Sequence, residues 1–369
     1  MNRMKLGEIL SVKHGWAFKG EYFAEDGEQS ILTPGNFFEK GGFKSNNGKE
    51  RYYTGTYPKE YLCHKGDLIV AMTQQAEGLL GSTALVPENN KYLHNQRIGL
   101  IICDEKRLNK LFAYYLFMTK SVREQLERSS SGTKVKHTSP EKIYDVEVEI
   151  PDVISQQKIA NLLWSIDEKI ANNNAINDNL EQQMHLIFEN MMAKAATHKL
   201  SGEYTIAQNL ATVVTGKEDA NFSVPNGKYK FFTCSNTPLS CDEYVFDSSS
   251  ILIAGNGDFN VKHYSGKFNA YQRTYVLTPD KKYFGLLYLA SLYRINSFKS
   301  RSSGSIVKFI TKSDVENIPV FIPNDRFYLQ ELNKLIYLQE QNKLENELLV
   351  NLRDWLLPML MNGQATISD

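Results

Sequence analysis

The sequence predicts an α+β protein in which two similar α+β domains are joined by two long helices packed as an antiparallel coiled coil. The main observation is a repeat. The segment Val146–Pro151 (VEVEIP) has a counterpart 172 positions later, Ile318–Pro323 (IPVFIP), and each copy precedes a long helical pattern. Each copy also follows a polar Ser-Gly stretch, at Ser129–Lys136 and at Ser302–Lys308. A repeat on this scale indicates a duplicated unit of one domain and one helix.

The repeat divides the chain into four parts. With 369 residues, the chain is long enough for two or three domains with separate cores. We expect a first domain over residues 1–150, a first helix over 151–200, a second domain over 201–322 and a second helix over 323–369.

The first helical pattern begins near Asp152 and Ser155, whose side chains are suited to cap a helix. At 1.5 Å per residue, a helix of roughly 36–40 residues would span ~54–60 Å. Its inward positions recur in steps of four and three, the period of a coiled coil: Ile159, Leu163, Ile166, Ile170, Asn173, Asn177, Leu180, Met184, Ile187 and Met191.

The second helical pattern begins after Pro323 and is expected to end around Pro358 and Gly363. Both helices turn polar in the middle of the seam, so antiparallel packing would bring the two polar segments together and fix the register. A plain helical hairpin and a dimerisation coiled coil are the alternatives. A shift of 172 positions from the first seam gives the second one: Leu335, Leu338, Asn342, Glu345, Leu349, Leu352, Leu356 and Met359.

Within each domain we expect short strands first and a helix late. Strand-like runs are Leu68–Met72, Gly99–Cys103, Ser250–Ala254 and Thr274–Thr278, and helical patterns cover Leu108–Arg128 and Phe284–Ser300. Similar pieces recur in the same order: Leu32–Phe37 with Phe232–Pro238, Gly66–Ala71 with Ser249–Ala254, and Asn95–Arg97 with Tyr271–Arg273. Because the scaffold repeats while most side chains differ, the two domains should bind related but non-identical targets.

The net charge is zero, but the charge is unevenly distributed. Residues 1–150 hold 21 Lys and Arg against 19 Asp and Glu, and residues 201–322 hold 13 against 10. The two helical segments are acidic. Two basic stretches, Lys106–Lys142 and Lys281–Lys312, occupy the same place in the repeat. One such stretch alone is as consistent with a solvated surface, but its recurrence favours an anionic ligand shared by both domains.

The sequence excludes several other classes of protein. No run approaches the ~18 apolar residues of a membrane span, and Gly7 and Glu8 interrupt any signal-peptide core. The four cysteines form no close pair and no zinc pattern with histidine. Thr215-Gly216-Lys217 lacks the upstream glycine of a phosphate loop. We therefore expect a cytoplasmic, non-catalytic chain with free thiols and without a cofactor or metal of its own.

Basic residues beside the two Ser-Gly stretches are candidates for binding DNA phosphates. They are Lys134, Lys136 and His137 in the first domain and Lys299, Arg301 and Lys308 in the second. Loop residues suited to read bases are Gln74, Gln75, Tyr52, Tyr53 and Lys59 in the first domain and Asn256, Asp258, Asn260 and Lys262 in the second. Taken alone, any one of these is more commonly an ordinary polar loop residue.

Two segments carry a family likeness. Ile150–Ile170 (IPDVISQQKIANLLWSIDEKI) resembles the helix-opening signature of type I restriction–modification specificity subunits, with Gln156-Gln157 where that family prefers Glu-Gln. Leu352–Gly363 (LRDWLLPMLMNG) resembles the closing pattern of the family's second conserved helix. The opening of the second helix, Pro323–Leu332 (PNDRFYLQEL), departs from the family pattern.

The resemblance implies two target-recognition domains, each reading one half of a bipartite, asymmetric site in double-stranded DNA. It further implies that the paired helices set the spacer and dock two methyltransferase subunits, which use S-adenosylmethionine. Restriction subunits using ATP with Mg²⁺ would complete the complex. The alternatives are the specificity chain of a different methylase or phage-defence assembly, a coiled-coil scaffold with protein-binding end domains, and an enzyme with an unrecognised site.

Overall fold

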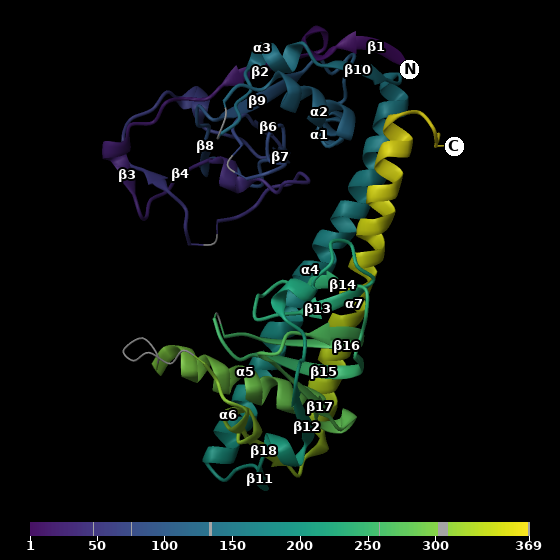
Figure 1. Cartoon of the computed structure of the whole chain (residues 1–369). Helices are drawn as coiled ribbons and strands as arrows, with labels where there is room; N and C mark the ends of the chain where they lie inside the picture. Colours follow the sequence, from purple (N-terminus) through teal and green to yellow (C-terminus); the bar gives the residue numbers. More distant parts are fainter. Residues whose placement is uncertain (47, 75, 133–134, 258, 302–308, 368–369) are drawn as a thin grey trace. The chain divides into compact units, whose positions relative to one another are not determined.

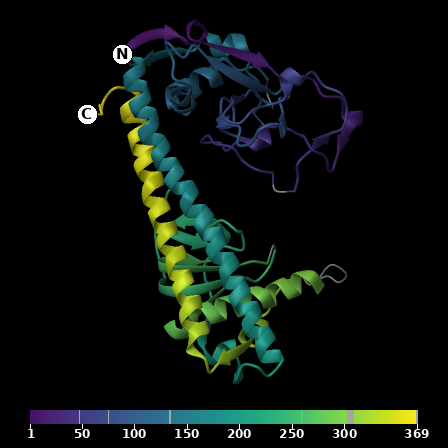
Figure 2. The same ribbon diagram turned by 180° about the vertical axis from the view of Figure 1, so that it is seen from behind.

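The structure is a computed structural model that describes residues 1–46, 48–74, 76–132, 135–257, 259–301 and 309–367, with only the backbone described at 298–301. It divides into two compact units. Unit 1 comprises Met1–Lys169 and Leu349–Asp369, and unit 2 comprises Ile170–Leu348. Two long helices, α4 (Val153–Ala196) and α7 (Arg326–Met361), each contribute to both units and run side by side (Figures 1 and 2).

The described residues of unit 1 form three small sheets, three short α-helices and four 3₁₀ helices. Strands β1 (Asn2–Lys5) and β10 (Glu147–Ile150) form the first sheet, and the second has the order β2 (Leu10–His14), β9 (Ile98–Cys103), β6 (Leu68–Ala71), β7 (Thr83–Leu85). The third has the order β3 (Phe23–Ala24), β5 (Tyr52–Tyr53), β4 (Ser30–Ile31), β8 (Tyr92–Leu93). The α-helices are α1 (Lys110–Leu116), α2 (Lys120–Ser129) and α3 (Pro140–Tyr144), and the 3₁₀ helices are η1 (Leu6–Glu8), η2 (Gly20–Tyr22), η3 (Pro34–Asn36) and η4 (Lys59–Tyr61).

The part of unit 2 that the structure describes forms two sheets. Strands β11 (Gly202–Ile206) and β18 (Pro319–Pro323) form one, and the larger has the order β12 (Ala211–Thr215), β17 (Thr274–Pro279), β15 (Phe246–Ala254), β16 (Val261–Ala270), β13 (Tyr229–Phe232), β14 (Leu239–Cys241). The helices besides α4 and α7 are α5 (Phe284–Arg301), α6 (Lys312–Glu316), η5 (Ala207–Asn209), η6 (Ala220–Phe222) and η7 (Lys281–Tyr283).

The topology confirms the duplication. The strand order β2-β9-β6-β7 of unit 1 recurs in unit 2 as β12-β17-β15-β16. The repeated IP segments form β10 and β18, and each pairs antiparallel with the first strand of its own repeat. Equivalent backbone hydrogen bonds also recur, from Leu6 N to Val146 O (2.9 Å) and from Ala207 N to Ile318 O (3.0 Å). Each IP segment is therefore the strand that completes its repeat before a long helix begins.

The α+β order within each unit is also as expected, with one difference. The pattern over Leu108–Arg128 forms two helices, because the chain turns at Met118 and Thr119 before α2 begins. The Thr119 hydroxyl accepts a hydrogen bond from Val122 N, which makes Thr119 the N-cap of α2. In unit 2 the single helix α5 spans the corresponding pattern.

Each unit has its own hydrophobic core. In unit 1, Phe112 of α1 packs with β6 and β9 and with Leu163 of α4 and Leu360 of α7. In unit 2, Leu287 of α5 packs with Ile253 of β15, Met184 of α4 and Leu335 of α7. The long helices therefore bury apolar side chains against the sheets and short helices of each unit, which positions those sheets on the helix pair.

The predicted inward face of α4 is confirmed. Side chains on it at most one-tenth exposed include Ile159, Leu163, Ile166, Asn173, Asn177, Leu180, Met184 and Met191. The helix begins as expected, because the carboxylate of Asp152 accepts hydrogen bonds from the Ser155 backbone (3.0 Å) and hydroxyl (2.7 Å). At 44 residues it is longer than predicted.

The predicted inward face of α7 is partly wrong. Leu338 and Leu352 are 41% and 43% exposed, whereas Gln339 is 3% exposed and Arg353 is half-buried. Polar residues take these inward positions because each has a partner there: Gln339 donates to Asn177 O, and Arg353 donates to Asp167 at 2.8 Å. Pro358 does not end the helix, which continues to Met361; the chain leaves it at Gly363, where φ is +68°.

The polar segments of the two helices meet within unit 2, which confirms antiparallel packing. Asn173 Nδ2 donates to Glu345 Oε2 (2.7 Å) and to Asn346 Oδ1 (2.9 Å), and Asn342 Nδ2 donates to Asn177 Oδ1 (2.9 Å). Because only one register satisfies these amides, the layer specifies how the helices align.

Candidate nucleic-acid interface

In unit 1 a loop is fastened to the end of strand β6. Gln74 N donates to Lys136 O at 2.9 Å, and Thr73 Oγ1 lies 3.1 Å from His137 Nδ1. Ser131 and His137 exchange two backbone hydrogen bonds, which closes the loop on itself. The sheet therefore brings Gln74, Lys136 and His137 together, although 62 positions separate Gln74 from Lys136 in the sequence.

The residues just before β9 lie next to this loop. Met72 N donates to Arg97 O at 3.1 Å, and Gln96 N donates to Trp16 O at 3.0 Å. Gln96, Arg97 and His137 are exposed, and Trp16 is 40% exposed. One end of the sheet thus carries a row of accessible side chains from three neighbouring strand ends and from Ser131 and His137.

Unit 2 repeats this arrangement. Gly255 N donates to Arg273 O and Ile310 N donates to Gly255 O, both at 2.8 Å. In unit 1 the same two hydrogen bonds join Met72 to Arg97 and Thr138 to Met72. The isolated bridge between Asn256 and Phe309 corresponds in the same way to the bridge between Thr73 and His137. The two sheet ends are therefore equivalent position by position.

A second loop of unit 2, Thr233–Ser235, is held at this sheet end by the side chains of β16 and the residue before it. Asn260 Nδ2 donates to Cys234 O at 2.8 Å, and Lys262 Nζ donates to the backbone oxygens of Thr233 and Ser235. Burial lowers the pKa of Lys262 to about 8. Lys262 thus stabilises the loop, whose Cys234 thiol donates to Arg273 O at 3.5 Å.

Comparison with known proteins identifies the fold. Residues 1–182 and 210–351 match the family described as the Type I restriction modification DNA specificity domain. The chain belongs to this family. Over its full length the chain is also similar to the crystal structure of the type I restriction–modification S subunit from M. genitalium, with a TM-score of 0.63, 18% identity and 96% of that chain covered.

Two relatives among specificity subunits match part of the chain. The Escherichia coli type I restriction enzyme EcoDI specificity subunit is 36% identical over 164 residues, which cover 42% of this chain and 37% of that protein. The Methanocaldococcus jannaschii MjaVIII specificity subunit is 23% identical over 168 residues, covering 45% and 39%. The chain thus spans less than two fifths of the length of either relative.

The structure places the predicted contact residues in different parts of the two units. Gln74, Lys136 and His137 share the sheet end of unit 1, and Asn256, Asn260 and Lys262 share that of unit 2. Tyr52 on β5 and Lys59 in η4 lie in other elements, and within the described chain no hydrogen bond joins either to Gln74 or His137. Gln75, Lys134, Asp258 and Lys308 fall outside the described residues, and the side chains of Lys299 and Arg301 at the end of α5 do as well.

Sequence reasoning missed three residues at these sheet ends: Trp16, Arg97 and Arg273. The signal for the two arginines was present, because Asn95–Arg97 and Tyr271–Arg273 align in the repeat. The repeat by itself indicates only that the two segments belong to the same scaffold. The structure adds that these residues are exposed and adjacent to the candidate loops.

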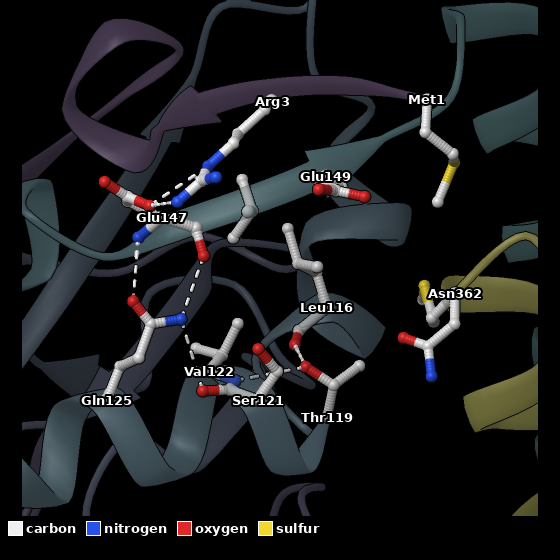
Figure 3. Close-up of a pocket in the computed structure, with 12 residues that line it drawn as sticks. Met1, Arg3, Leu116, Thr119, Ser121, Val122, Gln125, Glu147, Glu149 and Asn362 are labelled. Carbon is white, nitrogen blue, oxygen red and sulfur yellow. Dashed lines mark hydrogen bonds and ion pairs between the residues drawn. The ribbon is translucent and has the colours of Figure 1, made fainter.

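Unit 1 also has a pocket beside β1 and β10, and its lining is not suited to binding DNA phosphates (Figure 3). Arg3 and Glu147 form an ion pair in its wall, and the Gln125 amide bonds to both the backbone N–H and C=O of Glu147 at 2.9 Å. A second carboxylate, Glu149, also lines it. Two acidic side chains against one paired arginine disfavour a phosphate, so the polar contacts here stabilise the β1–β10 edge.

Two negative findings concern the part of the chain that the structure describes. No cluster of three or more His, Cys, Asp or Glu side chains is placed to hold a metal ion. No helix there combines the length and apolar character needed to cross a membrane. All four cysteines are free thiols, as the sequence predicted.

Proposed function

We propose that this chain is the DNA specificity subunit of a type I restriction–modification complex and carries no catalytic centre itself. Each unit reads one half of a bipartite, asymmetric site in double-stranded DNA. The helix pair sets the spacer and docks two methyltransferase subunits, and restriction subunits complete the complex. S-adenosylmethionine, and ATP with Mg²⁺, belong to those partner subunits in this proposal.

The proposal rests on one observation. The two units have equivalent backbone hydrogen bonds at one end of the sheet but carry different side chains there. Thr73 and His137 of unit 1 correspond to Asn256 and Phe309 of unit 2. Hydrogen-bonding and apolar groups at such positions distinguish base edges. A shared frame with different side chains is what two readers of unlike half-sites require, and membership of the family extends over both copies.

Exposed apolar side chains on the helix pair support the docking of partner subunits. In unit 2, Tyr337, Leu344 and Leu348 of α7 are 59%, 53% and 62% exposed. Their spacing of seven and four residues places them on one face of the helix. Large apolar side chains grouped on a soluble surface are typical of a protein interface.

The proposal is tested by mapping methyladenine. The chain is produced with its cognate methyltransferase subunits in a host free of adenine methylation. We expect methylation at one asymmetric motif with two defined halves and an undefined spacer. Methylation without a bipartite motif, or the absence of salt-sensitive DNA binding between ~50 and 200 mM salt, would favour a protein-binding scaffold.

A domain exchange separates the roles of the two units. Residues 1–150 are replaced by the corresponding domain of another family member, and residues 151–369 are kept. The mapped motif should change in one half only, because unit 2 keeps its own sheet end. A change in both halves would show that the halves are not read independently.

A further inference from the structure

The dipeptide Gln-Arg occupies the same framework position in both units. Gln96-Arg97 directly precedes β9, and Gln272-Arg273 directly precedes β17. Gln96 N donates to Trp16 O at 3.0 Å, and Gln272 N donates to Glu218 O at 2.9 Å. On the other side each arginine accepts a backbone hydrogen bond, from Met72 or Gly255. Equivalent strands therefore hold the two arginines on both sides.

Both guanidinium groups are available for a ligand. Arg97 and Arg273 are exposed, and within the described residues neither side chain makes an ion pair or hydrogen bond. Other arginines of unit 1 are engaged. Arg123 donates to four backbone carbonyl oxygens, and Arg353 pairs with Asp167 and Asp354.

The neighbours of the two arginines differ in chemistry. Trp16 borders the dipeptide in unit 1, and Glu218 borders it in unit 2. On the other flank, His137 in unit 1 corresponds to Phe309 in unit 2. Among these described neighbours the Gln-Arg pair is the same in both units, so it is suited to a feature that two different half-sites share. That feature is the sugar-phosphate backbone, which carries no direct sequence information.

We propose that Arg97 and Arg273 are equivalent phosphate contacts, one in each unit, that set the position of each reading domain on the duplex. This inference rests on the proposed function and names a contact within it. A guanidinium presents paired N–H donors that match phosphate oxygens. The differing side chains around it are then held against the base edges at a defined register.

The test measures how DNA affinity depends on salt. Arg97→Gln and Arg273→Gln are each made in the full chain, assembled with its methyltransferase subunits. Binding is measured at salt concentrations from ~50 to 200 mM. One duplex carries the motif found by methyladenine mapping, and the other carries a scrambled sequence. Each variant should weaken binding to both duplexes by a similar factor, roughly three- to tenfold, and make the log–log salt slope shallower by about 0.9.

Two further variants sharpen the result. Lys65→Gln removes an exposed cation just ahead of β6, at the end of that strand opposite to Thr73, and should leave affinity and slope unchanged. Arg97→Lys keeps the charge but loses the paired donors, so the salt slope should be retained while affinity falls. In all variants the methylated motif should be unchanged, and circular dichroism checks that each remains folded.

Two outcomes would overturn this inference alone. One is a relaxed base preference in a single half-site with an unchanged salt slope, which would make the arginine a base reader. The other is wild-type affinity and slope in both Gln variants. If the unaltered complex itself bound no DNA, the proposed function would fail and this inference with it.

Discussion

At the scale of single residues, one buried histidine links the large sheet of unit 2 to α7. His263 of β16 places Nδ1 3.0 Å from Glu340 Oε1 and Nε2 2.9 Å from Gln339 Oε1. The Ser265 hydroxyl donates to both oxygens of Glu340 at 3.0 Å. These contacts hold the large sheet of unit 2 on α7 through directional bonds, in addition to apolar packing.

The Glu340 carboxylate makes this link dependent on pH. Burial alone would raise its pKa, but hydrogen bonds from His263 and Ser265, together with the charges of His263 and Lys343, hold the pKa below its usual value. A carboxylate with a depressed pKa in the folded state contributes stability above its unfolded pKa of ~4.3 and loses it as pH falls through the folded pKa. The link should therefore weaken in acid.

Glu340→Gln should lower the free energy of unfolding at pH 7 by about 1–3 kcal/mol, because the His263 donor loses a charged partner. The variant should also lose less stability than the wild type between pH 5 and pH 3. Urea midpoints at several pH values measure both effects. Glu347→Gln, at a half-exposed ion pair with Lys230, is the matched control and should be nearly neutral. Parallel pH profiles for wild type and Glu340→Gln would contradict this account.

At the scale of elements, the helix pair combines apolar contacts with a polar layer. The amide of Asn342 donates to Asn177 Oδ1, and Asn173 bonds to Glu345 and Asn346. Buried amides contribute little net stability, but a mismatch leaves donors and acceptors unsatisfied. The polar layer therefore fixes the register of α4 against α7 more than it adds to the free energy of unfolding.

A pair of substitutions tests that role. Asn177→Leu should destabilise the chain by about 1–3 kcal/mol, because the Asn342 amide loses its partner. Adding Asn342→Leu should recover most of the loss through apolar contact. Guanidinium unfolding of the single and double variants gives the coupling energy, and Asn172→Ala on the exposed face is the control. Strictly additive losses would refute the proposed pairing.

The fold was largely predictable because its signals are periodic or repeated. The Asp152 cap and the seam from Ile159 to Met191 follow directly from helix geometry. The seam of α7 was less predictable, since Gln339 and Arg353 are polar residues that face inward only because Asn177 and Asp167 offer them partners. Such pairs form between the two helices, so the hydrophobic pattern of either helix alone does not predict them.

The candidate site was less predictable than the fold for the same reason. Lys262 has a side chain of the type that contacts phosphates, yet its ammonium binds the carbonyl oxygens of a neighbouring loop. Arg97, in contrast, is exposed at the sheet end only because strand pairing brings it beside Met72. Sequence identifies which side chains are chemically suitable. Strand register decides which of them are accessible together.

At the scale of the whole molecule, the polar contacts between the two long helices include one set in each unit. Asp167 pairs with Arg353 in unit 1, and Asn173 pairs with Asn346 in unit 2. Both helices pass from one unit to the other between these two sets of contacts. Residues inserted there in both helices leave each set of partners intact.

We therefore predict that one heptad inserted after Lys169 and one inserted before Leu349 will lengthen the DNA spacer. Seven helical residues add ~10 Å at 1.5 Å per residue, which corresponds to about three base pairs at ~3.4 Å each. The methyladenine map should show both half-sites unchanged and a longer spacer between them. A heptad in α4 alone would misalign the helices and should abolish methylation. Altered half-sites with the original spacer would show that the helix pair does not measure the distance between the two halves.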